Sequence, residues 1–217
     1  MSIIWIAFEV IINFYEGCFM ETYFIYKFLP PKTENTKKNI IAFALCFCTL
    51  GLLITVMNYL TIFEGILGIV CYLTALFLYA LVNRKGSIIK KLFAATVPLV
   101  MISLISIITL NFVSSVNSMS IKEIVTESGF ARFTVLIFAQ ALFFISVKLM
   151  LKLLATTSEN FNAVEWIAII LILAISIIMM FLLHLIAIDS TQRLYINLLI
   201  LTIFRYFFFG NILCKTI

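Results

Sequence analysis

Residues 83–116 read NRKGSIIKKLFAATVPLVMISLISIITLNFVSSV, in which four basic residues precede a stretch of 25 residues without a charged side chain. A helix needs about 20 apolar residues to cross a bilayer. Residues 92–116 are therefore predicted to span a membrane, and the cations before them to mark the face at which the helix enters. Pro98 removes one helical hydrogen bond near the start of this span, so we expect a kink there.

The rest of the chain has the same character. Of its 217 residues, 64% are hydrophobic and 12% are charged, which lie respectively above and below the shares usual in soluble domains. Six further apolar segments occupy residues 3–29, 40–57, 65–82, 130–154, 166–188 and 194–213. The sequence predicts an all-α, polytopic integral membrane helix bundle of about seven transmembrane helices, with residues 1–217 as a single domain in the cell membrane and no soluble domain.

Basic residues distinguish the two faces of this bundle. One set of alternate connections carries eleven of the fifteen: Lys27, Lys32, Lys37, Lys38, Arg84, Lys85, Lys90, Lys91, Lys148, Lys152 and Lys215. The other set carries Lys122, Arg132 and Arg193, and Arg205 lies inside the last segment. Because short cytoplasmic connections are rich in Lys and Arg, the N-terminus is predicted outside and the C-terminus in the cytoplasm. We interpret the net charge of +5 as attraction to anionic headgroups rather than to nucleic acid.

The first segment carries a polar stripe. Glu9, Asn13 and Glu16 are spaced by four and three residues, which places them on one helical face, with Glu21 nearby. A carboxylate facing lipid costs on the order of 3 kcal/mol, so the stripe is expected to face the bundle interior. Arg205 lies at a depth similar to that of Glu16, and we predict a contact between them, with Glu9 or Glu21 as substitutes. Such a pair either pins two helices together or forms a bistable element that a ligand moves.

Several polar residues fall on the predicted outer face, where they are candidate contacts for an extracellular signal. They are Asn58, Tyr59, Glu64, Glu127, Arg132, His184 and Asp189. Each is equally compatible with an ordinary solvated loop position. His184 is the only histidine, so it is either a packed imidazole or a ligand contact or pH-sensitive group, and one histidine cannot define a metal site.

Enzyme motifs do not appear in this sequence. A nucleophile elbow, a zinc-binding HExxH, a Walker loop and paired carboxylates in polar surroundings are all missing. The five cysteines lie within or at the ends of apolar segments and show no metal or disulfide spacing, so we interpret them as small apolar groups. Cys71 and His184 lie at different predicted depths, which argues against a Cys–His nucleophile pair. We expect no catalytic residue, no metal and no cofactor in this chain.

Four groups of short strings carry a family resemblance: residues 5–9 (WIAFE) with 12–14 (INF) and Glu16; residues 58–59 (NY) with 61–65 (TIFEG); residues 85–91 (KGSIIKK); and residues 127–129 (ESG) with Arg132. They resemble the membrane-sensor region of Firmicute histidine kinases of the GHKL type, the class that includes accessory-gene-regulator quorum receptors. The similarity covers the first six segments and weakens at the seventh. It implies a two-component receptor that binds an extracellular signal, often a small peptide. Helix movement would then pass to a cytoplasmic dimeric kinase and its response regulator.

The kinase part of that family would follow the last predicted span. His184 lies in the membrane zone and does not match the family's phosphate-accepting histidine. The resemblance therefore implies either the sensor portion of a longer kinase or a relative without a kinase module, in a homodimer. A second class of function is a substrate-binding integral membrane subunit of a vitamin or metabolite importer, with the polar stripe facing a ligand at the midplane. A third is a structural or assembly membrane protein without a specific ligand.

Overall fold

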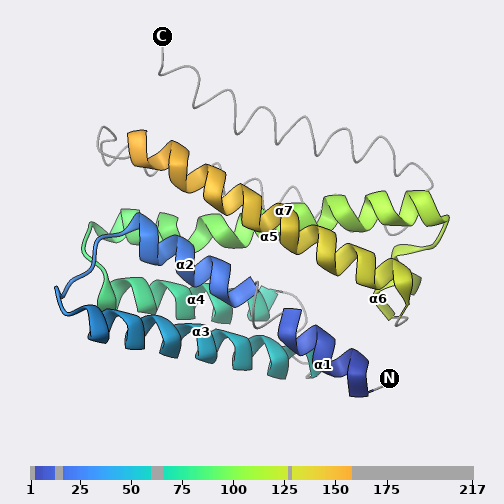
Figure 1. Cartoon of the computed structure of the whole chain (residues 1–217), viewed down its shortest axis with the longest axis horizontal. Coiled ribbons are helices and arrows are strands. Elements are labelled where there is room, and N and C mark those ends of the chain that lie inside the picture. Colours follow the sequence, from blue (N-terminus) through green and yellow to red (C-terminus); the bar gives the residue numbers. More distant parts are fainter. Residues whose placement is uncertain (1–2, 13–16, 60–65, 127–128, 158–217) are drawn as a thin grey trace, which may run out of the picture.

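A computed structural model describes residues 3–12, 17–59, 66–126 and 129–157. Every regular element within these ranges is a helix, as Figure 1 shows. The helices are α1 (Ile3–Ile12), α2 (Phe19–Phe28), α3 (Thr36–Tyr59), α4 (Ile66–Asn83), α5 (Ile88–Asn117), α6 (Ile121–Thr126) and α7 (Phe130–Thr157). The predicted first span, residues 3–29, thus contains two helices, α1 and α2, on either side of residues 13–16, which lie outside the described ranges.

Three helices in the described part of the chain are long and apolar enough to cross a membrane. Their apolar stretches are Thr36–Val56 in α3, Ile88–Asn117 in α5 and Phe130–Leu154 in α7. Large apolar side chains lie exposed along them, including Ile41, Leu45, Leu52, Phe112, Phe138, Ile145 and Leu149. A soluble protein rarely exposes so much contiguous apolar surface. A lipid bilayer is therefore the environment that these helices suit.

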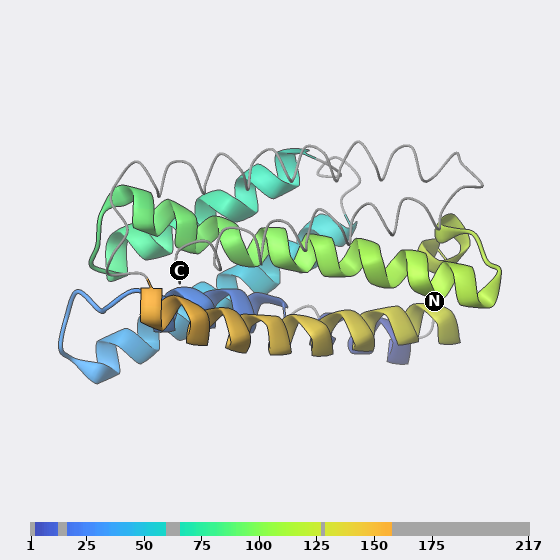
Figure 2. The same cartoon turned by 90° about the horizontal axis from the view of Figure 1, so that it is seen from above.

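Helix α5 lies at the centre of the described bundle. In the most apolar stretch of α5, 56% of the residues are buried, whereas the corresponding share in α3 is 17%. α5 packs against α2, α4 and most extensively α7, and Figure 2 shows α5 and α7 running side by side. The core between them contains Phe24, Leu76, Phe93 and Phe143, each buried to 2% exposure or less. Ser87 caps the N-terminus of α5, and its side chain accepts a hydrogen bond from the Lys90 amide. α5 then continues through Pro98 as a single helix.

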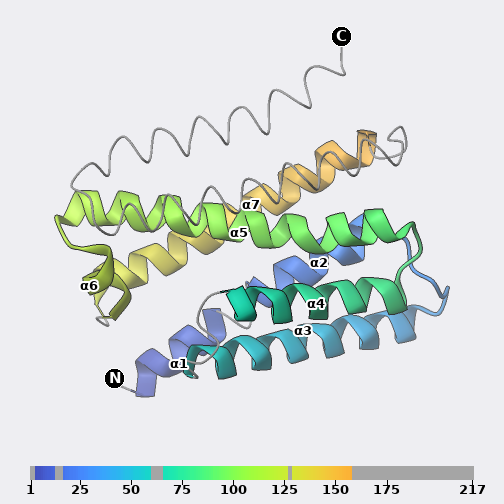
Figure 3. The same ribbon diagram turned by 180° about the vertical axis from the view of Figure 1, so that it is seen from behind.

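One end of the bundle, here called the cationic end, collects most of the basic residues. α2, α4 and α7 end there, and α3 and α5 begin there (Figure 3). Ten basic residues of the described ranges lie at or near it: Lys27, Lys32, Lys37, Lys38, Arg84, Lys85, Lys90, Lys91, Lys148 and Lys152. Two backbone hydrogen bonds join the connection between α2 and α3 to the connection between α4 and α5. The Lys32 amide donates to the Asn83 carbonyl over 3.1 Å, and the Lys85 amide donates to the Pro30 carbonyl over 2.8 Å.

The short helix α6 closes the opposite end. It has six residues, Ile121–Thr126, with Glu123 in its first turn. Ser120 and Glu123 form a reciprocal capping box, in which each backbone amide donates to the other residue's side chain, over 2.7 and 3.1 Å. Ile124 packs there against Val113 and Val135, so the turn from α5 into α7 has a small core of its own.

Candidate functional site

A polar contact joins α1 to the first turn of α7 at the end opposite the cationic end. Arg132 Nη2 lies 2.5 Å from Glu9 Oε1 in a salt bridge whose side chains are 21% and 17% exposed. The indole Nε1 of Trp5 donates to the same carboxylate oxygen over 2.9 Å. The guanidinium carbon also lies 6.0 Å from the Trp5 ring centroid, a cation–π distance. We call Trp5, Glu9 and Arg132 the α1–α7 contact.

Aromatic side chains flank the α1–α7 contact on both helices. The rings of Phe8 and Phe133 stack with centroids 5.0 Å apart, and Trp5 lies 5.6 Å from Phe8. Offset stacking adds roughly 1 kcal/mol to apolar burial. The short helix α1 is thus held on α7 by a charge pair and by ring packing together, and a change at one of them alters how α1 sits on α7.

A second polar group lies inside the bundle and comes from three helices. Glu21 of α2 is only 2% exposed, and its carboxylate accepts a hydrogen bond from the Tyr72 hydroxyl of α4. That hydroxyl also lies 3.5 Å from Cys18 Sγ. On α3, Cys46 Sγ lies 3.8 Å from the Thr22 hydroxyl. We call Cys18, Glu21, Thr22, Cys46 and Tyr72 the buried polar cluster.

The carboxyl group in the buried polar cluster is expensive to bury. Among the described residues no Lys or Arg forms an ion pair with Glu21, so Tyr72 is its principal partner. A buried carboxyl group without full hydrogen bonding costs several kcal/mol in an apolar environment. Ionisable groups retained inside a membrane bundle commonly mark a ligand or ion pathway. Glu21 is accordingly a candidate functional residue whose side chain lies in the bundle interior.

Two buried amides were missed by the sequence reasoning. Asn111 of α5 is fully buried and Gln140 of α7 is 7% exposed. The side-chain carbonyl oxygen of each makes no hydrogen bond in the described part of the structure. Their only sequence signal is an amide in the middle of an otherwise apolar span, which is the kind of residue that bonds across helices in membranes.

Most of the other predicted site residues lie outside the described ranges. These are Asn13, Glu16, Glu64, Glu127, His184, Asp189 and Arg205, so the predicted contact between Glu16 and Arg205 stays a prediction. Asn58 and Tyr59 end helix α3. The structure instead brings together two residues that the sequence had assigned to different groups, Glu9 of the intramembrane stripe and Arg132 of the outer face.

Metal and catalytic chemistry gain no support from the described side chains. Within them, no three His, Cys, Asp or Glu residues are arranged to hold a metal ion. The chemistry available at the α1–α7 contact and at the buried polar cluster is recognition through hydrogen bonds and charge. Comparison with family models, with curated proteins and with solved structures finds no match for this chain.

Proposed function

We propose that this chain is a membrane-embedded signal-sensing region of the kind found in GHKL-type histidine kinases. In this proposal, seven helices cross the cytoplasmic membrane, with the N-terminus outside and the cationic end in the cytoplasm. An extracellular signal such as a peptide binds at the outer end, and helix movement passes to a kinase module outside residues 1–217. A homodimer and a response regulator complete the pathway.

The observation that carries the proposal is the salt bridge between Glu9 and Arg132. It lies at the end that the charge distribution assigns to the outside, and both side chains retain some exposure. A peptide brings a carboxylate or an ammonium group that competes for one member of the pair. Such competition shifts the equilibrium between two conformations of the bundle only as far as the ligand binds one conformation more tightly than the other.

Helix α7 offers the route from the outer end to the cationic end. It begins beside α1 at Arg132 and runs the length of the bundle against α5 and α2. Near its far end, Lys148 Nζ lies 3.1 Å from the Tyr23 hydroxyl of α2. A shift of α7 that follows loss of the Glu9 pair would therefore change contacts at the cationic end.

Two distance measurements by pulsed electron paramagnetic resonance test this route in a cysteine-free protein in nanodiscs. One spin-label pair, at Ile11 and Phe138, reports on the outer end, and a second pair, at Lys38 and Lys152, reports on the cationic end. Glu9→Gln should change both distance distributions, whereas Glu34→Gln, at an exposed loop glutamate, should change neither. A Glu9→Gln variant that alters only the outer pair would contradict transmission.

The kinase connection has a separate test. An antibody against residues 30–39 detects the native polypeptide in its own membranes, and the intact mass of that species is measured. A species with a few hundred additional residues, or a kinase that co-purifies with the chain, would support the sensor proposal. A native species near 24.7 kDa with no associated kinase would contradict it.

A substrate-binding subunit of a vitamin or metabolite importer is the second candidate, and the buried polar cluster favours it. A carboxyl group and a phenol deep in a bundle can hold a polar ligand at the midplane. Such a subunit retains its small ligand through purification, whereas a sensor purified without its signal is empty. Mass spectrometry of the purified chain and of Glu21→Gln distinguishes them, since a bound metabolite lost in the variant would support the importer.

A further inference from the structure

The cationic end contains a pocket between α2 and α7 to which neither candidate function assigns a ligand. It has a volume of about 340 Å³ and is lined by Tyr23, Lys27, Phe28, Lys148, Leu151, Lys152 and Leu154. That volume falls within the range of about 300–1,000 Å³ typical of small-ligand sites. Three of the seven lining residues are lysines, so the pocket combines positive charge with an apolar wall.

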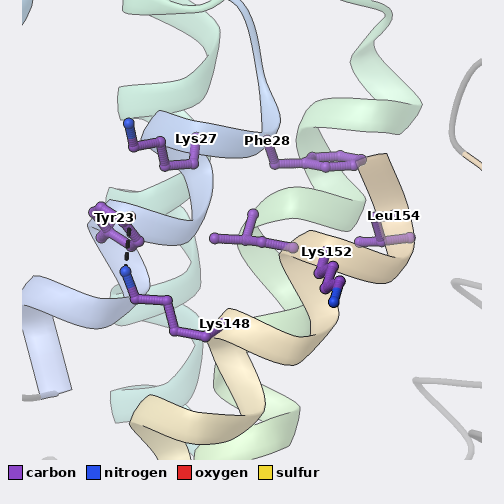
Figure 4. Close-up of a pocket in the computed structure, with 7 residues that line it drawn as sticks. Tyr23, Lys27, Phe28, Lys148, Lys152 and Leu154 are labelled. Carbon is purple, nitrogen blue, oxygen red and sulfur yellow. Dashed lines mark hydrogen bonds between the residues drawn. The ribbon is translucent and has the colours of Figure 1, made fainter. Parts of the chain in front are cut away.

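The cations of the pocket are organised around one phenol ring. Lys148 Nζ donates to the Tyr23 hydroxyl over 3.1 Å and lies 4.7 Å from its ring centroid. Lys27 Nζ lies 5.9 Å from the same centroid. Figure 4 shows the ammonium groups of Lys27 and Lys148 on opposite sides of Tyr23, with Lys152 on the neighbouring helix. Tyr23 thus holds Lys148 in place at the pocket.

Carboxylates do not neutralise this charge within the described residues. Lys27, Lys148 and Lys152 are all exposed, and no described Asp or Glu forms an ion pair with any of them. The pocket is therefore lined by three lysines whose charge no described carboxylate neutralises. A phosphate group, which accepts several charge-assisted hydrogen bonds, is the anion that such a cluster suits.

Beside the pocket, the surface of α7 is apolar. Exposed side chains recur with helical spacing along one face: Phe138, Leu142, Ile145 and Leu149. Lys152 follows Leu149 by three residues and so continues the same stripe. An acyl chain lying along this stripe would bring its headgroup phosphate to the lysines, an arrangement that a free phosphate ion does not need.

We propose that the Tyr23–Lys27–Lys148–Lys152 pocket binds the phosphate headgroup of an anionic membrane lipid, with an acyl chain along α7. Basic pockets between transmembrane helices commonly bind such headgroups. Both leaflets contain headgroup phosphates, so the proposal holds for either orientation of the chain and does not rest on the sensing function.

Native mass spectrometry of the purified chain with added phosphatidylglycerol tests the site. The pocket variant is Lys27→Gln/Lys148→Gln/Lys152→Gln, and the matched control is Lys37→Gln/Lys38→Gln/Lys85→Gln. The control removes three exposed lysines at the same end but outside the pocket. Both variants should elute from size exclusion like the parent, because each replaces exposed side chains. The pocket variant should retain at least about tenfold less phosphatidylglycerol than the control, because only the pocket lysines would contact the headgroup directly.

Two results would overturn the proposal. Equal retention by the two triple variants would mean that the lysines act only as general surface charge. Displacement of the lipid by millimolar inorganic phosphate would identify a free-anion site instead. A phosphatidylglycerol with a diazirine in its acyl chain gives a further readout, since its crosslinks should map to the α7 peptide that contains Phe138, Leu142, Ile145 and Leu149 and should disappear in the pocket variant only.

Discussion

The guanidinium carbon of Arg84 lies 4.2 Å from the ring centroid of Tyr26, inside the protein at the cationic end. Arg84 is 1% exposed, and its Nη2 donates to the Tyr79 hydroxyl over 2.9 Å. A planar guanidinium can stack and donate at once, whereas an ammonium cannot reproduce both contacts. Arg84 thus joins α2 to α4 through two aromatic rings.

We expect Arg84→Lys to lower the melting temperature of the purified protein in detergent by about 4–8 °C. A desolvated cation–π contact contributes about 2 kcal/mol, and 1 kcal/mol corresponds to roughly 2–4 °C in a chain of this size. Tyr26→Phe keeps the ring and should have a smaller effect than Tyr26→Leu. Lys85→Gln, at the exposed neighbouring residue, serves as the control, and an equal loss in that variant would contradict the stacking argument.

Charge reversal tests the α1–α7 contact. Glu9→Arg and Arg132→Glu should each reduce thermal stability, because each places like charges where the 2.5 Å pair now lies. The double variant should recover most of the loss, with a coupling energy of about 1 kcal/mol in a double-mutant cycle. Heating followed by fluorescence-detected size exclusion provides the measurement. Additive losses in the double variant would show that the two side chains do not interact.

Removing the donor from the buried polar cluster should be more costly than removing both partners. Tyr72→Phe leaves the Glu21 carboxyl group without its donor, at a cost of roughly 1–3 kcal/mol. The double variant Tyr72→Phe/Glu21→Leu removes the unsatisfied group as well and should be more stable than Tyr72→Phe alone. Melting temperatures of the three proteins decide this, and a double variant less stable than Tyr72→Phe would refute the stated energetics.

Thiol labelling of intact cells tests the orientation. In a cysteine-free background, Ser118→Cys should react with a membrane-impermeant maleimide from outside, because Ser118 follows the end of α5 opposite the cationic end. Lys38→Cys, in the first turn of α3, should react only after the cells are permeabilised. The reverse pattern would invert the topology.

Sequence reasoning predicted the helical class because apolar length and charge position are local properties of the chain. The 25 uncharged residues 92–116 required no knowledge of neighbours, and they lie within α5. The sequence placed Glu21 only near the polar stripe, and its burial against Tyr72 depends on how α2 and α4 pack.

Pairing between distant residues could not be predicted in this way. Glu9 and Arg132 are 123 positions apart in sequence, and depth alone paired Arg205 with any of several carboxylates and gave no partner for Arg132. Arg84 was assigned only a topological role, because its burial between Tyr26 and Tyr79 depends on how α2 and α4 pack. The pocket lysines were likewise counted only as charge, since their grouping arises from the approach of α2 to α7.

Two backbone hydrogen bonds, from Lys85 to Pro30 and from Lys32 to Asn83, bear on the order in which the chain assembles. Their partners are about 50 residues apart in sequence, so the ribosome completes α4 before either bond forms. Closing the two bonds therefore requires the hairpin of α3 and α4 to be complete, because that hairpin returns residues 83–85 to the side of residues 30–32.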